Sequence, residues 1–177
     1  MVTITNGIVK INEATVTVSN ILTYNGVVHV VDAVIQELPE NVLDVVVGSD
    51  VHTTLETAVL AAGLDGALSD PDASLTVFAP TDEAFAKMPK GSVESLLKPE
   101  NKKRLREILK YHIIKSRVPA KKISSGTAKL KMLNEKRAVL SSKDGKVKIN
   151  QANILKADIM AKNGIIHIID EVLLPQK

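Results

Sequence analysis

The side chains that most often perform catalysis or hold metals are few and scattered in this chain. Its 177 residues include no Cys and four His, which are His29, His52, His112 and His167. No two of these His stand at the short spacing of a metal-ligand pair. The sequence also lacks the patterns of a nucleophile elbow and of a phosphate-binding loop. We therefore expect no catalytic residue, no metal ligand and no cofactor, and we predict that the chain is not an enzyme.

Two of the His, His29 and His167, are each followed three residues later by an Asp, and this likeness belongs to a longer repeat. The segment VKINEATVTVSNILTYNGVVHVVDAVIQ begins at Val9, and VKINQANILKADIMAKNGIIHIIDEVLL begins at Val147, 138 positions later, with 11 of 28 aligned residues identical. A period of this length indicates a repeated domain rather than a solenoid unit. We predict a complete domain at residues 40–177 and a partial repeat, the tail of another copy, at residues 1–39.

The partial repeat is short and apolar, so it needs a partner surface. A segment of this size is too small to be stable alone, and its Ile and Val residues are costly to leave in water. We expect residues 1–39 to dock on the same chain or on a neighbouring chain as an added or exchanged β-element, which includes a homodimer through residues 1–39. A structural tandem or self-association unit is therefore an alternative function. Residues 14–31 carry no charged side chain but contain Thr, Ser, Asn and Asn-Gly, and they predict a β-hairpin rather than a transmembrane segment.

The net charge of +3 conceals an uneven distribution. Residues 1–86 contain one Lys against 12 acidic residues, and residues 87–177 contain 22 Lys and Arg against 8 acidic residues. The basic segment starts with Lys102, Lys103, Arg106 and Lys110 and continues through Lys121 and Lys122. It suits an acidic polysaccharide, a small ligand or head-to-tail contact with an acidic surface. A solvated helix face that keeps the chain soluble gives the same pattern. Nucleic acid is not an expected partner, because two Tyr and two Phe are too few for base stacking.

The order of the predicted elements indicates an α+β fold. Apolar periodicity predicts helices at residues 41–47, 53–62 and around 99–112, with Thr81 as the cap of another helix. The predicted strands are residues 75–78, 130–133, 138–141, 147–150, 154–159 and 165–173. We expect primed turns at Asp144-Gly145 and Asn163-Gly164, with a positive φ at Gly164. Segregated helices and antiparallel strands are typical of the α+β class.

Three motifs make the chain resemble the fasciclin-like domain family. TVFAPTDEAFAKMP at residues 76–89 is similar to the first family signature, Tyr111-His112 to the central Tyr-His motif, and GIIHIIDEVL at residues 164–173 to the second signature. The resemblance covers about residues 42–175, and residues 6–38 resemble the last third of a preceding domain. It implies a wedge-shaped β-sandwich of mostly antiparallel strands, with helices wrapped around one side.

The resemblance also implies a function in cell adhesion. Fasciclin-like domains occur in secreted and surface-anchored proteins, so it implies an extracellular or cell-surface location and a cell-surface receptor or extracellular matrix component as partner. The residues that match the family's contact motifs are Tyr111, His112, Ile113, Ile114, Asp158 and Ile159. Met1 is followed by a β-like pattern, so a secretion signal is either lacking or was removed from this sequence.

Each of these residues also has a structural interpretation. His112 continues an apolar helix face and could be a buried, neutral imidazole that joins helix to sheet. Tyr111 suits either a partly exposed anchor or a ring at the edge of the core. His167 alternates with Ile165 and Ile169, which predicts a core position. Asp158 precedes a tight turn and could simply solvate the end of a strand.

Overall fold

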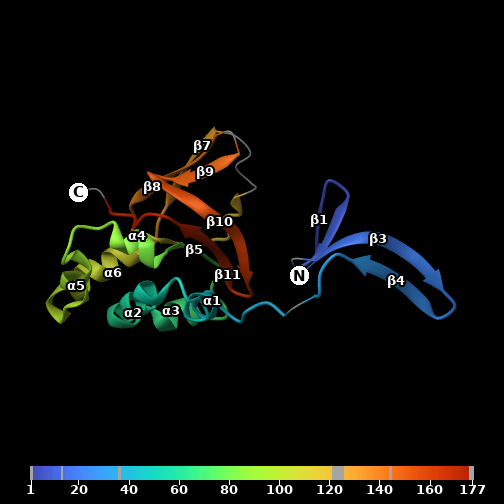
Figure 1. Cartoon of the computed structure of the whole chain (residues 1–177), viewed down its shortest axis with the longest axis horizontal. Helices are drawn as coiled ribbons and strands as arrows, with labels where there is room; N and C mark the ends of the chain where they lie inside the picture. Colours follow the sequence, from blue (N-terminus) through green and yellow to red (C-terminus); the bar gives the residue numbers. More distant parts are fainter. Residues whose placement is uncertain (1, 13, 36, 121–125, 144, 176–177) are drawn as a thin grey trace. The chain divides into compact units, whose positions relative to one another are not determined.

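The chain forms two compact units in a computed structural model (Figure 1). Unit 1 is Met1–Leu38 and unit 2 is Pro39–Lys177. The structure describes residues 2–12, 14–35, 37–120, 126–143 and 145–175. Lys121, Lys122 and Asp144, which belong to the predicted basic segment and to a predicted turn, lie outside the described residues.

Unit 1 is a four-stranded antiparallel sheet, drawn in blue in Figure 1. Its strands follow one another in space as they do in the sequence: β1 (Val2–Thr5), β2 (Ile8–Ile11), β3 (Ala14–Thr23) and β4 (Gly26–Val31). β4 pairs with β3 only and is therefore an edge strand of the unit 1 sheet.

Unit 2 contains a seven-stranded sheet in the order β6-β5-β11-β10-β9-β8-β7. The strands are β5 (Leu75–Pro80), β6 (Ile113–Ile114), β7 (Gly126–Lys131), β8 (Arg137–Lys143), β9 (Lys146–Ile149), β10 (Ala152–Ala161) and β11 (Gly164–Ile169). β5 and β11 are parallel, and the other neighbours are antiparallel. The two signature motifs are therefore neighbours in the sheet, because Thr76 of the first motif pairs with Ile165 of the second.

The helices of unit 2 mostly precede the strands in the sequence, as predicted. They are α1 (Val42–Val47), α2 (Thr53–Ala62), α3 (Asp65–Ser69), α4 (Asp82–Ala86), α5 (Ser92–Leu97), the 3-10 helix η1 (Pro99–Asn101) and α6 (Lys102–Lys110). Local signals define their ends: the Thr81 hydroxyl accepts the Ala84 N–H at the start of α4, and Gly63 ends α2 with a φ of 66°.

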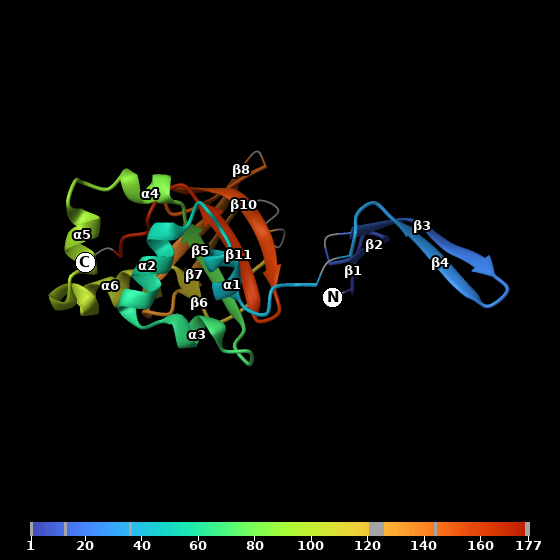
Figure 2. The ribbon, with the colours of Figure 1, turned by 60° about the horizontal axis from the view of Figure 1, so that its bottom comes forward.

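Two apolar clusters lie on opposite faces of β5 and β11. The first joins the helices to the sheet and includes Val42, Leu55, Val77, Leu109 and Ile166. The second lies between these central strands and the β7–β9 end of the folded sheet, and it includes Phe78, Met132, Leu140, Ile149 and Ile169. In Figure 2, α2 to α6 lie to one side of β5 and β11. The α+β class, the sandwich of mostly antiparallel strands and the helices on one side are confirmed.

The sequence repeat is also a structural repeat. β2, β3 and β4 correspond residue for residue to β9, β10 and β11 at the offset of 138, and β1 corresponds to the last part of β8. The irregularities match as well: β3 and β10 carry two register shifts at equivalent places, and Asn20 and Asp158 have φ values of 60° and 59°. The repeated pattern therefore determines the bulges as well as the strands.

The predicted primed turn at Asn163-Gly164 is wrong. Ala161 pairs with Gly164, so the turn residues are Lys162 and Asn163, and neither they nor Gly164 has a positive φ. Gly164 is required for a different reason. A Cβ on it would lie 2.6 Å from the Leu75 carbonyl oxygen and 2.7 Å from Val42 Cγ1. The close approach of β5 and α1 thus excludes a side chain at this position.

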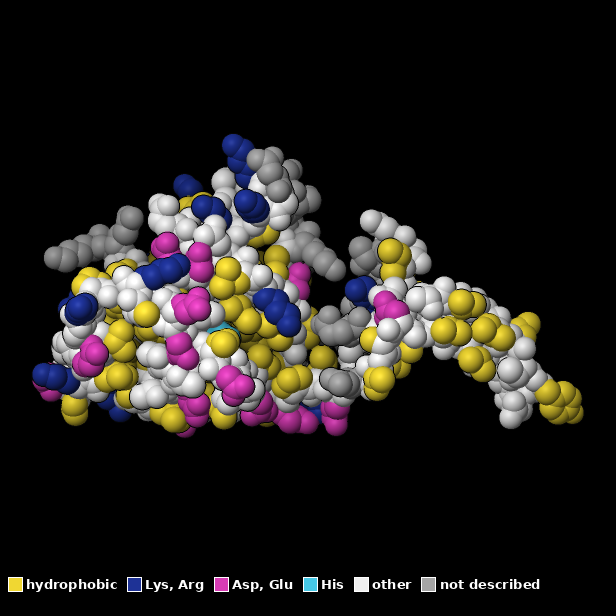
Figure 3. Space-filling view, in the orientation of Figure 1, with side chains coloured by type: hydrophobic (Ala, Val, Ile, Leu, Met, Phe, Trp, Pro, Cys, Tyr) yellow, Lys and Arg dark blue, Asp and Glu magenta, His cyan; other side chains and the backbone are white. Residues whose placement is uncertain are grey.

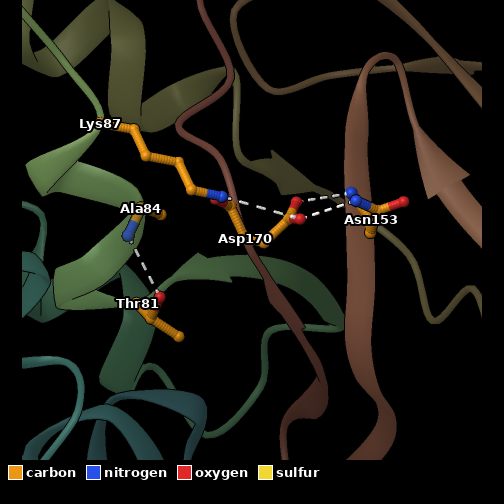
Figure 4. A network of polar contacts seen from close by, with 5 residues as sticks. All are labelled: Thr81, Ala84, Lys87, Asn153 and Asp170. Atoms are coloured by element: carbon orange, nitrogen blue, oxygen red, sulfur yellow. Dashed lines mark hydrogen bonds and ion pairs between the residues drawn. The ribbon is translucent and has the colours of Figure 1, made fainter.

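The final strand is shorter than the predicted residues 165–173, since β11 ends at Ile169. Asp170 follows β11 directly and contacts β10 and the end of α4, as Figure 4 shows. Its carboxylate accepts the backbone and side-chain N–H groups of Asn153 at 2.7 and 2.6 Å and lies 3.8 Å from the Lys87 ammonium. The Asp170 carboxylate thus takes up the Asn153 backbone N–H, and the ladder of hydrogen bonds between β10 and β11 ends here. These hydrogen bonds hold the pKa of Asp170 below its usual value against the opposing effect of burial.

Candidate functional site

The second bulge of β10 gives Asp158 an unusual backbone conformation. The register between β10 and β11 shifts between Lys156 and Ile159, and Asp158 has a φ of 59°. Asp and Asn tolerate this left-handed region better than most residues. Asp158 is half-buried, and its Oδ1 accepts the Ala120 N–H at 2.8 Å. Its carboxylate therefore holds the segment that follows β6, and among the described residues it bonds through Oδ1 alone.

A segment that we call the strap, residues 115–120, is attached to three strands by side-chain hydrogen bonds. The Thr76 hydroxyl of β5 donates to the Ser116 carbonyl at 2.6 Å and accepts the Val118 N–H at 2.9 Å. Asp158 of β10 binds the Ala120 amide, as described above. The strap is therefore an ordered part of the candidate site, although its residues 115–119 have no regular secondary structure.

His167 of β11 forms hydrogen bonds to both the bulge and the strap. Its Nδ1 accepts the Asp158 N–H at 3.1 Å, so the proton is on Nε2, which donates to the Val118 carbonyl at 3.0 Å. The ring is fully buried and lies against Phe78 with centroids 5.3 Å apart. Burial lowers the pKa of His167, although the Val118 carbonyl and Asp158 oppose this shift. The predicted core position of His167 is confirmed.

The predicted contact residues 111–114 lie inside unit 2. The exposed fractions of Tyr111, His112, Ile113 and Ile114 are 3, 2, 3 and 6%. The His112 Nδ1–H donates to the Ile108 carbonyl at 2.8 Å, and Nε2 accepts the Leu173 N–H at 2.9 Å. Burial lowers the pKa of His112 to about 4, so the ring is neutral and joins α6 to the end of the chain.

Tyr111 is likewise engaged inside the unit. Its hydroxyl donates to the Arg137 carbonyl at 2.9 Å and accepts the Asn150 Nδ2–H at 3.1 Å. A cavity of about 870 Å³ opens beside it, with Val139 and Leu174 among its lining residues. The structure therefore places Tyr111 between helix and sheet, at the wall of this cavity, with only a small part of its surface exposed.

Asp158 and Ile159 are the two predicted contact residues that approach the surface. Ile159 is half-buried and packs against the helix-side core, whereas the preceding residues 155–157 are exposed, with Leu155 at 58%. The exposed stretch thus places an apolar side chain and the Lys156 cation next to the half-buried carboxylate of Asp158 at the bulge.

The predicted basic residues lie on α6, and two of them have partners within unit 2. Arg106 donates to the Gly63 carbonyl at 3.0 Å. Its positive charge is favourable there, because the C-terminal end of α2 is the negative end of the helix dipole. The Lys110 ammonium lies 3.7 Å from Glu107. Lys102 and Lys103 are exposed on the same helix. In Figure 3, acidic side chains gather along the edge over α1 to α3, and basic side chains lie over β7 to β9.

Sequence reasoning missed the strap. Its bonds to Thr76, Asp158 and His167 join residues that are 38 to 49 positions apart. One local signal was available, because Pro119 favours an extended conformation at the preceding residue, Val118. Nothing in the sequence shows, however, that this extended segment crosses the β10 bulge.

Two further findings on the described residues concern metal binding and membrane-spanning helices. Within the ranges given above, no three His, Cys, Asp or Glu side chains lie together in a way that would hold a metal ion. Across those same ranges, no helix has the length and apolar character needed to cross a membrane.

Comparison with known proteins identifies relatives along most of the chain. Protein sll1483 of Synechocystis sp. is 46% identical over 134 residues, which are 76% of this chain and 73% of that protein. Transforming growth factor-beta-induced protein ig-h3 of Sus scrofa is 35% identical and periostin of Homo sapiens 32% identical, each over 171 residues. Those alignments cover 96% of this chain but only 24% of ig-h3 and 20% of periostin.

A solved structure has the same fold. It is a FAS1 domain pair from the insect cell adhesion molecule fasciclin I, which matches 91% of this chain and 60% of its own with a TM-score of 0.71 at 22% identity. The fasciclin domain model itself matches residues 1–37 and 50–175, so the match includes segments of both units. On these matches and on the paired signature strands, the chain belongs to the fasciclin domain family.

Proposed function

We propose that this chain is an extracellular or cell-surface adhesion module that binds a protein receptor or a matrix component without catalysis. The observation that carries the proposal is membership of the fasciclin domain family, one of whose solved structures comes from a cell adhesion molecule. We place the contact surface at the β10 bulge, where Asp158 lies beside exposed Leu155 and Lys156.

In this proposal the buried motif residues act indirectly. Ile113 and Ile114 pair with β5, and His112 ties α6 to Leu173, so together they fix the point where the strap leaves the sheet. The strap then holds Asp158 through the Ala120 amide. The second carboxylate oxygen of Asp158 is the group that we assign to the partner, as an acceptor for a donor or as a ligand of a receptor-bound cation.

The repeat supplies a conservative test of this carboxylate. Asn20 occupies the equivalent bulge position in unit 1 at nearly the same φ, and its N–H donates to His29 as that of Asp158 does to His167. Asp158→Asn therefore keeps the backbone conformation and an oxygen acceptor for Ala120 but removes the charge. Asp158→Ala loses the acceptor and places Ala in the left-handed region, so we expect about 2 kcal/mol lower stability.

The experiment measures attachment of the purified chain to a panel of immobilised matrix and receptor proteins at physiological salt, with melting temperature as the control. We expect Asp158→Asn to melt like the parent chain and to attach at least several-fold less. Equal attachment by both proteins would refute the bulge as the contact surface.

Acidic polysaccharides are the second candidate, because the C-terminal half carries the excess of Lys and Arg. Lys102 and Lys103 are exposed cations of α6, and the test is charge reversal at these two residues. Attachment that disappears in moderate salt and in this double variant, but is unaffected by Asp158→Asn, would favour the polysaccharide.

A further inference from the structure

The two copies of the repeat have the same strands but very different surroundings. In unit 2, Ile165 and Ile166 of β11 are each 2% exposed and His167 is fully buried. At the equivalent positions of unit 1, Val27 and Val28 are 51 and 48% exposed and His29 is also exposed. Figure 3 shows the resulting gathering of hydrophobic side chains over β3 and β4.

Unit 2 shows what covers this surface in the complete copy. β5 lies parallel to β11 in an unbroken register from Leu75 opposite Gly164 to Pro80 opposite Ile169. The Phe78 ring of β5 lies against the His167 ring at a tilt of 36°, and the Val118 carbonyl accepts the His167 Nε2–H. β4 pairs with β3 in the same antiparallel register as β11 pairs with β10. The outer edge of β4, however, has no paired strand within the unit 1 sheet.

The edge of β4 also lacks the usual protection against strand pairing. Natural edge strands are protected by Lys, Pro or bulges. Residues 14–31, which include all of β3 and β4, contain no Lys, Arg, Asp, Glu or Pro, and the register shifts of the pair leave β4 continuous from Gly26 to Val31. An uncharged, apolar and continuous edge is suited to accept a further strand.

We propose that unit 1 is a strand acceptor: the outer edge of β4 binds an extended, uncharged, apolar segment of another polypeptide in parallel orientation, with an aromatic ring over His29. The expected ligand has the chemistry of β5, since β5 covers the equivalent edge of β11. The β5 of an intact fasciclin domain is unsuited to this role, because β6 and β11 already occupy both of its edges. This inference is independent of the proposed adhesion function.

A peptide with the sequence of residues 73–81, capped at both ends, is the probe. It is titrated into the full chain while the ring protons of His29 and the amide exchange of β4 are followed by NMR. We expect saturable binding, a ring-current shift of His29 and slower exchange along β4. A peptide with Phe78→Ala should lose the His29 shift, and one with Val77→Pro, which removes a backbone donor, should bind about tenfold or more weakly.

Matched variants of the chain locate the site. Val28→Asp places a charge on β4 and should abolish peptide binding. Leu155→Asp, at an apolar position of unit 2 that is 58% exposed against 48% for Val28, should not change it. Absence of a His29 shift at saturating peptide would overturn the proposal. So would a stable dimer in light scattering that the peptide does not dissociate, because a second copy would then occupy β4. Asp158→Asn should bind the peptide normally, which separates this test from that of adhesion.

Discussion

Substitution of Gly164 by Ala tests whether the two signature strands meet as closely as the structure shows. An added Cβ would lie 2.6 Å from the Leu75 carbonyl oxygen and 2.7 Å from Val42 Cγ1, whereas ordinary contacts begin at 3.4 Å. β5 and α1 would have to move away by about 0.8 Å, which overpacking data place at about 3 kcal/mol. Ala is better than Gly in a strand by roughly 0.5–1 kcal/mol, so the net loss is about 2 kcal/mol.

The repeat offers the matched control, Gly26→Ala. The nearest atom to a Cβ on Gly26 is the Thr23 hydroxyl oxygen at 4.0 Å, and Gly26, like Gly164, has no positive φ. We therefore expect this variant to be neutral or slightly stabilising. The two Gly occupy equivalent turns, so a difference between the variants isolates the contact with β5 and α1.

The assay is urea unfolding followed by tyrosine fluorescence and far-ultraviolet circular dichroism. Tyr111 is buried and Tyr24 is fully exposed, so the fluorescence change reports mainly on unit 2. A loss of 2 kcal/mol corresponds to a melting temperature lower by about 4–8 °C. Superimposed unfolding curves for Gly164→Ala and the parent chain would refute the close approach, and equal losses in both variants would indicate a shared backbone requirement instead.

Two further predictions concern buried polar groups of unit 2. Between pH 6.5 and 4 the unfolded chain binds a proton at His112 that the folded chain does not. The free energy of unfolding should therefore fall by about 3 kcal/mol as the pH is lowered through this window. Above pH 6.5 the contribution of His112 should stay constant. An NMR titration of the His112 ring with an apparent pKa near 6.5 would contradict its burial. Asn163→Ala removes bonds to the Val42 amide and to the Leu68 and Asp70 carbonyls and should cost about 3 kcal/mol in urea unfolding. Asn25→Ala, at the equivalent exposed position, should be nearly neutral, and similar losses in both would show that the turn itself needs Asn.

The sequence alone predicted the features that depend on neighbours along the chain. Helix ends at Thr81 and Gly63 follow from side-chain capping and from the freedom of Gly, which act within a few residues. Alternating apolar residues predicted most strands, and the repeat predicted that residues 9–36 would form the same β-structure as residues 147–174. The family motifs were also readable, since each is a short run of adjacent residues.

The tertiary structure decided which of those residues are accessible. The motif match predicted Tyr111 and His112 as contact residues, but both are buried, because Tyr111 packs in the cluster of β7–β9 and His112 bonds to Leu173. Asp158 receives the Ala120 amide from 38 positions away, and Gly164 is constrained by β5 and α1 rather than by its own φ. The clearest case is the repeat: similar strands are buried in β11 and exposed in β4, because burial depends on the segments that pack against a strand and not on the strand's own sequence.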